Sequence, residues 1–268
     1  MNIAALLTDF TDADGYPAVM KGVMLSLAPD SHIIDLSHAV PHQDVFHAAQ
    51  LLARSAPFFP SGTVFVCVVD PGVGTQRRGI IASLGDQYYV GPDNGLMSFV
   101  YRKALTKKAP VRVFRLDNPA FMLSPVSFTF HGRDVFAPAA AYLMNGTPLE
   151  DFGEKVADPV LLDLPEPVRT EAGLEGVILH IDAFGNLGTS IRAEHLAQSV
   201  KITIILYGQT VRGLLDTFGE GRQGDLVALI DSDGYLAVSL VNGSARKLLN
   251  ANVGDIVLVS VPSDESSF

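Results

Sequence analysis

The chain of 268 residues is 48% hydrophobic and 18% charged, with a formal net charge of −10 at pH 7. This apolar content is enough to bury a core and excludes a disordered chain. No basic block occurs, so we expect no nucleic-acid partner. Without an apolar run of 18 residues or a secretory leader pattern, we expect no membrane span and a cytoplasmic protein. The single cysteine, Cys67, lies in an apolar run and is expected to be a core residue.

The first 160 residues alternate apolar runs of strand length with segments of helical periodicity. This order predicts an α/β domain over residues 1–160, with a mostly parallel sheet flanked by helices. Gly85-Asp86 has the composition of a two-residue hairpin turn, and Pro138 interrupts or delays the last helix. We expect strands at 3–7, 33–36, 63–69, 80–84, 87–90 and 111–116, and helices at 16–27, 44–54, 95–101 and 134–144.

The composition changes after residue 157, where three prolines interrupt any periodicity. We expect a linker at 161–171 and a second domain at 172–268. Short apolar runs are separated there by turn sequences at 232–234 and 242–243. This spacing is typical of a smaller all-β, barrel-like domain or a sandwich. The predicted strands lie at 175–181, 200–207, 226–230, 235–240 and 255–261.

The apolar run 64–69 ends at Asp70-Pro71-Gly72, and Arg77 and Arg78 follow. Ligands of open α/β sheets bind beyond the carboxyl ends of the strands. A carboxylate, a glycine-rich loop and an arginine are therefore expected at the functional edge. Neighbouring loop residues point apart, so only one of the two arginines is expected to face the site. A structural ion pair between Asp70 and Arg77 beside a tight turn is the alternative.

Three aspartates, Asp9, Asp12 and Asp14, follow the first predicted strand. Converging carboxylates can bind a hard metal ion or accept hydrogen bonds from sugar hydroxyls. Asp12 and Asp14 could equally cap the next helix, whereas Asp9 lies at the strand end and is the stronger functional candidate. No His-Glu-x-x-His motif occurs, so a zinc site is poorly supported.

Three further segments combine polar side chains with turn residues. His131, just before a predicted helix, could be a general base, a ligand or a core residue. The Pro-Asp-Asn-Gly segment at 92–95 is interpreted as a structural turn. The Asp-Ala-Phe-Gly-Asn segment at 182–186 offers a ring for stacking and an amide that can pair with the adenine edge. A plain turn between two strands is the alternative there. Neither a dinucleotide-binding motif nor a P-loop occurs.

Together, five segments resemble those of the S-adenosyl-L-methionine (SAM) hydroxide adenosyltransferases, or SAM hydrolases, relatives of fluorinase and chlorinase. The resemblance covers nearly the whole chain, and the Asp-Pro-Gly-Val-Gly-Thr-x-Arg string is its specific part. It implies SAM as the substrate, adenosine and L-methionine as the products, and no cofactor. It also implies a homotrimer in which SAM lies between the N-terminal domain of one subunit and the C-terminal domain of the next. The five segments are 7–10, 70–77, 92–95, 131–134 and 182–186.

The resemblance also implies roles for individual residues. Asp70, Arg77 and His131 match the set around the attacking water, and Asp9 matches the aspartate that holds the ribose hydroxyls. The positions around methionine and adenine are matched by Asp182, Phe184, Asn186, Ser232 and Asn242.

Two departures from fluorinase indicate water rather than halide as the nucleophile. Asp70 and Val73 stand where fluorinase has tyrosine and threonine near the halide. The long insertion of the halogenases is absent, since only Gly85-Asp86 separates two predicted strands. Gln43 stands where fluorinase has a tryptophan near the ribose.

The sulfonium of SAM is already a good leaving group, so hydrolysis mainly requires a water held in line with C5′. Arg77 could favour a developing hydroxide, and His131 or Asp70 could orient the water or accept its proton. We therefore expect a SAM hydrolase without a metal. The alternatives are halide-dependent cleavage of SAM, a non-catalytic SAM- or adenosine-binding protein, and a metal-dependent phosphoesterase that uses Asp9, Asp12 and Asp14.

Overall fold

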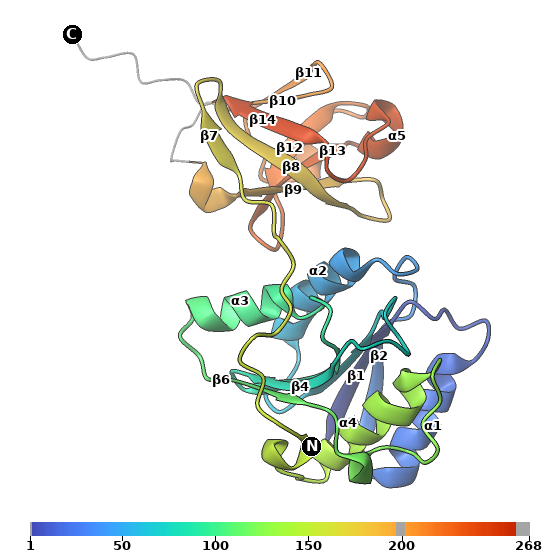
Figure 1. The fold of residues 1–268 in the computed structure, drawn as a ribbon. Helices are drawn as coiled ribbons and strands as arrows, with labels where there is room; N and C mark the ends of the chain where they lie inside the picture. The colour runs from blue at the N-terminus through green and yellow to red at the C-terminus, as the bar shows by residue number, and fades with distance from the viewer. Residues whose placement is uncertain (1, 197–201, 261–268) are drawn as a thin grey trace. The chain divides into compact units, whose positions relative to one another are not determined.

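The computed structural model describes residues 2–196 and 202–260, and the chain divides into two compact units between Leu162 and Asp163 (Figure 1). The first unit contains strands and helices, and the second is built almost wholly of strands. The predicted order of an α/β unit followed by a barrel-like β unit is confirmed. Within the described residues, every helix is too short or too polar to cross a membrane.

A six-stranded sheet forms the centre of the first unit, in the order β2-β1-β3-β5-β4-β6. Strand β1 pairs in parallel with β2 and β3, and β3 pairs in parallel with β5. Strand β4 is antiparallel to both of its neighbours, because the predicted hairpin reverses the chain. The sheet is therefore mixed. Its strands are β1 (Ile3–Thr8), β2 (His32–Ser37), β3 (Val64–Val68), β4 (Gly79–Leu84), β5 (Gln87–Pro92) and β6 (Val111–Arg115).

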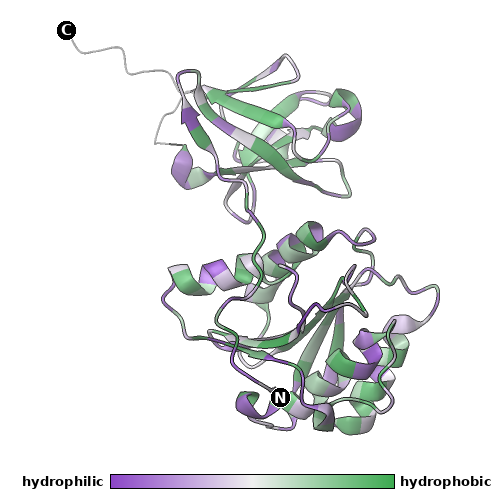
Figure 2. Ribbon diagram, in the orientation of Figure 1, coloured by the Kyte–Doolittle hydropathy of each residue, from purple (hydrophilic) through white to green (hydrophobic). Residues whose placement is uncertain are grey.

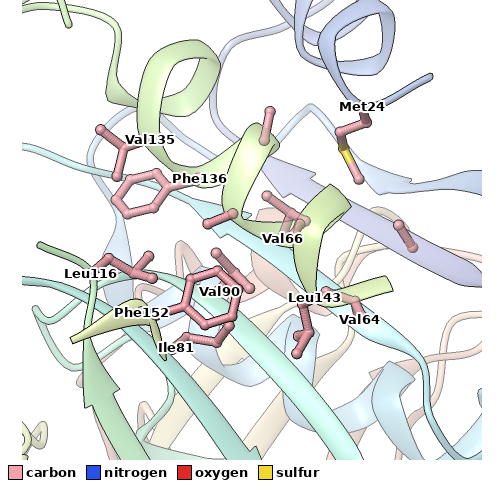
Figure 3. Close-up of a cluster of buried hydrophobic side chains, with 14 of the residues drawn as sticks. Met24, Val64, Val66, Ile81, Val90, Leu116, Val135, Phe136, Leu143 and Phe152 are labelled. Atoms are coloured by element: carbon pink, nitrogen blue, oxygen red, sulfur yellow. The ribbon is translucent and has the colours of Figure 1, made fainter. Parts of the chain in front are cut away.

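Helices cover both faces of this sheet (Figure 1). Successive side chains of a strand point to opposite faces. Ala4 and Leu6 of β1 accordingly pack with α1 and α4, whereas Ala5 and Leu7 pack with α2 and α3. Figure 3 shows the first of these cores, in which Phe136 and Phe152 lie among aliphatic side chains. The helices are α1 (Tyr16–Leu27), α2 (Val45–Ser55), α3 (Ser98–Thr106) and α4 (Ala137–Met144).

Two predicted helices begin elsewhere than expected. The helix predicted at 95–101 is found as α3, which begins later, at Ser98. Asn94 and Gly95 instead form a turn in which the Leu96 amide donates to the Asn94 side chain. The helix predicted from residue 134 is preceded by a π-helix at Gly132–Phe136, so the helical turn starts two residues earlier. A hydrogen-bonded turn therefore follows β5, and a π-helical turn precedes α4.

An antiparallel sheet forms the second unit, in the order β11-β10-β14-β8-β9-β13-β12, with β7 paired to β8. The Leu215 amide donates to the Ala228 carbonyl at 2.9 Å near its two edges, so the barrel is nearly closed. The central strands of both units are coloured as hydrophobic in Figure 2. The strands are β7 (Val168–Thr170), β8 (Gly173–Ile181), β9 (Leu187–Arg192), β10 (Thr203–Leu206), β11 (Gln209–Arg212), β12 (Leu226–Ile230), β13 (Tyr235–Leu240) and β14 (Ile256–Ser260), and α5 (Ala245–Leu249) follows β13.

Several strands of the second unit were not predicted from the sequence pattern. Strand β9 carries the buried polar residues Thr189 and Ser190, whose hydroxyls bond to the Leu236 carbonyl and the Val177 amide. Its apolar density is therefore too low for recognition. Strand β7 lies within the stretch predicted as a linker. The strands predicted at 200–207 and 255–261 each extend beyond the described residues, at 200–201 and 261.

Candidate active site

The carboxyl ends of the parallel strands of the first unit bring three polar segments to one edge of the sheet. Thr8 at the end of β1 pairs with Val68 at the end of β3, so Asp9 and Asp70 follow neighbouring strands. Strand β5 lies beside β3 and leads into the 92–95 turn. This is the edge at which ligands of such sheets bind.

The loop after β3 folds back through two consecutive turns. The Val73 amide donates to the Asp70 carbonyl, and the Thr75 amide donates to the Gly72 carbonyl, each at 3.2 Å. Gly74 has a φ of 75°, and a Cβ there would overlap the Phe128 carbonyl oxygen. The loop thus requires glycine at this position, and its path returns Arg77 to Asp70.

Arg77 joins Asp70 and His131 in one cluster. Its Nε lies 2.9 and 3.0 Å from the two carboxylate oxygens of Asp70, and its Nη2 also donates to Oδ2. The same Nη2 lies 2.8 Å from Nδ1 of His131. The side chains of Arg77 and Asp70 are 12% and 5% exposed, so water screens this pair weakly. The three residues grouped by the resemblance therefore meet through Arg77, which contacts both of the others.

The hydrogen bond from Arg77 fixes the state of His131. A guanidinium has only donors, so Nδ1 of His131 must accept, and the neutral ring carries its proton on Nε2. Partial burial and the charge of Arg77 lower the pKa of His131 below its usual value of 6.5, against an opposing influence of Asp70 and Asp134. His131 is therefore neutral near pH 7 and presents an N–H donor at Nε2.

Asp134 braces the segment that carries His131. Its buried carboxylate accepts from the Ser127 amide at 2.8 Å and from Nε of Arg133 at 2.6 Å. Burial alone would raise the pKa of Asp134, but these hydrogen bonds lower it. Asp134 lies within the π-helix that begins directly after His131, and such widened turns are frequent at functional sites. Asp134 was not predicted as a site residue, although a charge at the start of an apolar helix is a signal that indicates such a role.

Asp9 offers one free carboxylate oxygen at the sheet edge. The side chain is largely buried, and its Oδ2 accepts from the Gln43 amide at 2.8 Å. Within residues 2–196 and 202–260 no hydrogen bond to its Oδ1 is found, so that oxygen keeps its capacity to accept. Phe10, the next residue, contacts Phe130 edge-to-face at 5.9 Å between ring centroids. The Asp9 turn and the His131 segment are thus packed together.

Asp12 and Asp14 do not cap the helix that follows them. Gly15 is the N-cap of α1, and no side chain caps this helix. The predicted capping is therefore wrong, because Gly15 takes the left-handed conformation at the cap. Among the residues that the structure describes, no three His, Cys, Asp or Glu side chains are grouped closely enough to hold a metal ion.

The turn at 92–95 holds both ends of the 70–77 loop. The Asn94 side chain donates to the Val69 carbonyl at 2.8 Å, just before the loop. Just after the loop, Nε of Arg78 donates to the Asp93 carboxylate at 2.8 Å. Arg78 also bonds to Asp158 and so points away from Arg77, as expected for neighbours in an extended loop. The interpretation of this turn as structural is supported, and the loop depends on it.

In the second unit, Asp182 braces the turn at 182–186 from within. Its Oδ1 accepts from the amides of Phe184 and Asn186, each at 2.9 Å, and its Oδ2 accepts from the Asn186 side chain at 2.7 Å. Gly185 has a φ of 86° and lies against Ser244. The Phe184 ring is left 79% exposed on a rigid turn.

The structure brings Asn242 to this turn but separates Ser232 from it. Asn242 follows β13 and comes two residues before Ser244, which packs against Gly185. Ser232 lies in the turn before β13, beyond the pairing of Tyr235 with Arg192. The 182–186 turn comes directly before β9, and Ser232 lies beyond the other end of that strand, so the length of β9, about 17 Å, separates them.

Comparison with known families decides the assignment. The family models described as SAM hydroxide adenosyltransferase N-terminal domain and C-terminal domain match residues 4–153 and 176–258. The chain belongs to the SAM hydroxide adenosyltransferases. Asp70, Arg77 and His131 lie within the N-terminal family domain, and the 182–186 turn lies within the C-terminal one.

Individual similar proteins match nearly the full length of the chain. An (R)-S-adenosyl-L-methionine hydrolase of Salinispora tropica is 40% identical over 94% of this chain and 95% of its own. A fluorinase of Actinoplanes sp. is more distant, at 29% identity over 88% and 90%. A crystal structure of an uncharacterized conserved protein from Thermotoga maritima superposes with a TM-score of 0.86 at 32% identity, covering 96% of this chain and 99% of that one.

Proposed function

We propose that this SAM hydroxide adenosyltransferase hydrolyses SAM at the sheet edge of its first unit, by attack of water or hydroxide on C5′, giving adenosine and L-methionine. Hydrolysis of SAM is supported by the hydrolase relatives at 32–40% identity. The observation that carries the proposed mechanism is the contact of Arg77 with both Asp70 and His131. No cofactor enters this scheme, because the leaving group is the substrate's own sulfonium.

The cluster favours an anionic nucleophile. Arg77 supplies a fixed positive charge, and Nε2 of His131 supplies a donor, so together they stabilise hydroxide character on the attacking oxygen. His131 is a poor proton acceptor in this state, because Nδ1 already accepts from Arg77 and Nε2 is protonated. Asp70 keeps lone-pair capacity beyond its bonds to Arg77. We therefore assign Asp70 as the acceptor of the water proton and His131 as the donor that orients the oxygen.

The bonds balance without a further reactant. The water oxygen forms a bond to C5′ as the C5′–S bond breaks. The electron pair of that bond stays on sulfur and neutralises the sulfonium to the thioether of methionine. The proton leaves through Asp70 to solvent. Water in place of halide is consistent with Asp70 and Val73 at the two positions that differ from fluorinase.

Further residues would hold the substrate. The free Oδ1 of Asp9 is suited to accept from a ribose hydroxyl. Phe184 offers an exposed face for stacking on adenine, and Asn186 retains its side-chain oxygen for pairing. By the family resemblance we propose a cytoplasmic homotrimer with SAM between the first unit of one subunit and the second unit of the next, with Asp182, Ser232 and Asn242 on the second side. Of these, Ser232 has the least support, because it lies at the far end of β13.

The products of a SAM incubation test this function. We expect equal amounts of adenosine and L-methionine by chromatography and mass spectrometry, at a rate independent of chloride and chelator. Chloroadenosine would instead indicate halide-dependent cleavage. Tight binding of SAM without methionine release would indicate a binding protein, and loss of turnover with chelator would indicate a metal-dependent enzyme.

Subunit mixing tests the proposed assembly. Variants Arg77→Lys and Phe184→Ala would damage opposite sides of each shared site. After co-refolding, some sites would combine an intact first unit with an intact second unit. At SAM concentrations below the wild-type KM, where both variants are impaired, activity above that of either variant alone is therefore expected. Activity equal to the average of the two would place the whole site within one subunit.

A further inference from the structure

A chain of polar side chains runs inward from the surface of the first unit and ends beside Asp9. Nζ of Lys21 lies 2.6 Å from Oδ2 of Asp35, and Oδ1 of Asp35 lies 2.9 Å from Nε2 of His38. Nδ1 of His38 lies 2.8 Å from the hydroxyl of Thr8. Thr8 and His38 are buried, whereas Lys21 and Asp35 are partly exposed. The proposed chemistry uses none of these four residues.

The direction of two bonds in this chain follows from the groups involved. The Asp35 carboxylate can only accept, so Lys21 and Nε2 of His38 donate to it. The Thr8 hydroxyl oxygen already accepts from the Phe10 amide at 3.2 Å. With its proton on Nε2, His38 then accepts the Thr8 hydroxyl proton at Nδ1. The side-chain polar atoms of Thr8 and His38, the two buried members of the chain, are therefore all satisfied.

His38 holds the Asp9 turn at two points. Its ring bonds to Thr8, just before Asp9, and its backbone carbonyl accepts from the Thr11 amide at 2.9 Å, just after Asp9. The remaining contact of Asp9 comes from Gln43, in the segment that follows His38. The orientation of the free Asp9 oxygen therefore depends on contacts to the turn around Asp9, and His38 makes two of these contacts.

We propose that His38 is a positioning residue that fixes the orientation of Asp9 toward the ribose hydroxyls of the substrate. This inference rests on the proposed ribose-binding role of Asp9. It differs from a purely structural role in one respect: the bond from His38 to Thr8 sets ribose recognition, whereas the bond from His38 to Asp35 serves mainly to hold the ring.

Two variants of His38 separate these bonds. His38→Asn keeps a polar atom near the Nδ1 position and can still meet Thr8, but it loses the contact with Asp35. His38→Gln keeps a polar atom near the Nε2 position and can still meet Asp35, but it loses Thr8. The readouts are kcat and KM for SAM, the thermal midpoint, and the ratio of the affinities for adenosine and 2′-deoxyadenosine by calorimetry.

We expect His38→Gln to raise KM for SAM and to reduce the preference for adenosine over 2′-deoxyadenosine by about tenfold, the effect of one lost hydrogen bond of about 1.4 kcal/mol. His38→Asn should retain that preference within about threefold. If both variants keep the wild-type preference and differ only in thermal midpoint, His38 is structural and the inference is wrong.

Two controls keep these outcomes distinct. If the wild type shows no preference for adenosine, the ribose-binding role of Asp9 fails, rather than the role of His38. If the His38 variants do not fold, Thr8→Val and Thr8→Ser take their place, because serine restores the hydroxyl that valine lacks. Loss of the preference in Thr8→Val with recovery in Thr8→Ser supports the inference, and equal preference in both overturns it.

Discussion

The Asp70–Arg77–His131 cluster of the first unit and the 182–186 turn of the second are built in opposite ways. The cluster joins residues 54 positions apart in the sequence, and its charged side chains are buried against one another. The turn is braced chiefly within its own five residues by Asp182, with one bond from outside, from the Arg246 amide to the Gly185 carbonyl at 3.0 Å, and it presents Phe184 to solvent. The first arrangement exists only when the sheet and α4 are assembled, whereas the second is fixed locally.

This difference separates two functions. Charge stabilisation requires a fixed and poorly hydrated cluster, because water would weaken each electrostatic contact. Recognition of a flat ring requires an exposed surface on a rigid support. Substitutions in the cluster should therefore act on turnover, and substitutions in the turn should act on binding.

Arg77→Lys should have the largest effect. Lysine keeps the charge, but it has no planar fork to hold Asp70 and His131 together. We expect kcat to fall by about 10²- to 10³-fold, the usual loss for one preorganised donor. The matched control is Arg112→Lys, which changes an exposed arginine paired with Glu150. Steady-state kinetics with SAM checks this, and wild-type kcat in Arg77→Lys would show that the cluster is structural.

Gly74→Ala should have the next largest effect. The added Cβ would meet the Phe128 carbonyl and the residue would hold an unfavourable φ, so the loop must shift. We expect kcat to fall by tenfold or more, together with a lower thermal midpoint. Gly62→Ala is the control, since its φ of 81° is similar but no atom lies near its Cβ. Equal loss of kcat in both variants would remove the link between this loop and turnover.

Phe184→Ala should act on binding alone. The ring is 79% exposed, so its removal should leave the thermal midpoint unchanged, while KM for SAM should rise about tenfold, as for one lost base–aromatic stack. Phe58→Ala removes an equally exposed ring, at 83%, from the first unit. An unchanged KM in Phe184→Ala would show that the 182–186 turn only connects β8 and β9 and does not bind the substrate.

The titration of His131 gives the smallest effect. Its pKa should lie below 6.5 by NMR, because burial and Arg77 oppose its protonation. Arg77→Met should raise this pKa toward 6.5. In the wild type, between the lowered pKa of folded His131 and pH 6.5, the unfolded state binds a proton that the folded state does not. The contribution of His131 to the free energy of unfolding is therefore full above pH 6.5 and falls as the pH drops toward that lowered pKa. A His131 pKa above 6.5 in the wild type would contradict the hydrogen bond from Arg77 to Nδ1.

Local pattern was enough to predict the strand ends and the loops that follow them. The apolar run ending at Asp70 and the turn chemistry of 85–86 and 92–95 are encoded within a few residues. The α/β and β units follow from the same periodicities, and hence the edge of the sheet where Asp9 and Asp70 meet.

Partnerships between distant side chains could not be read in this way. Nothing in the local sequence around His38 indicates its contacts with Thr8 and Asp35. Asn94 likewise donates to the Val69 carbonyl, 25 residues earlier, and Asp134 accepts from the Ser127 amide in the segment before the π-helix. The polar strand β9 was missed because its buried hydroxyls are satisfied by neighbouring strands.

Hydrolysis of SAM in oxygen-18 water tests the central claim most directly. If the cluster directs water to C5′, the adenosine product carries one oxygen-18 at O5′ and the methionine carries none. Adenosine without the label, or a halogenated adenosine formed in the presence of chloride, would contradict direct hydrolysis at this site.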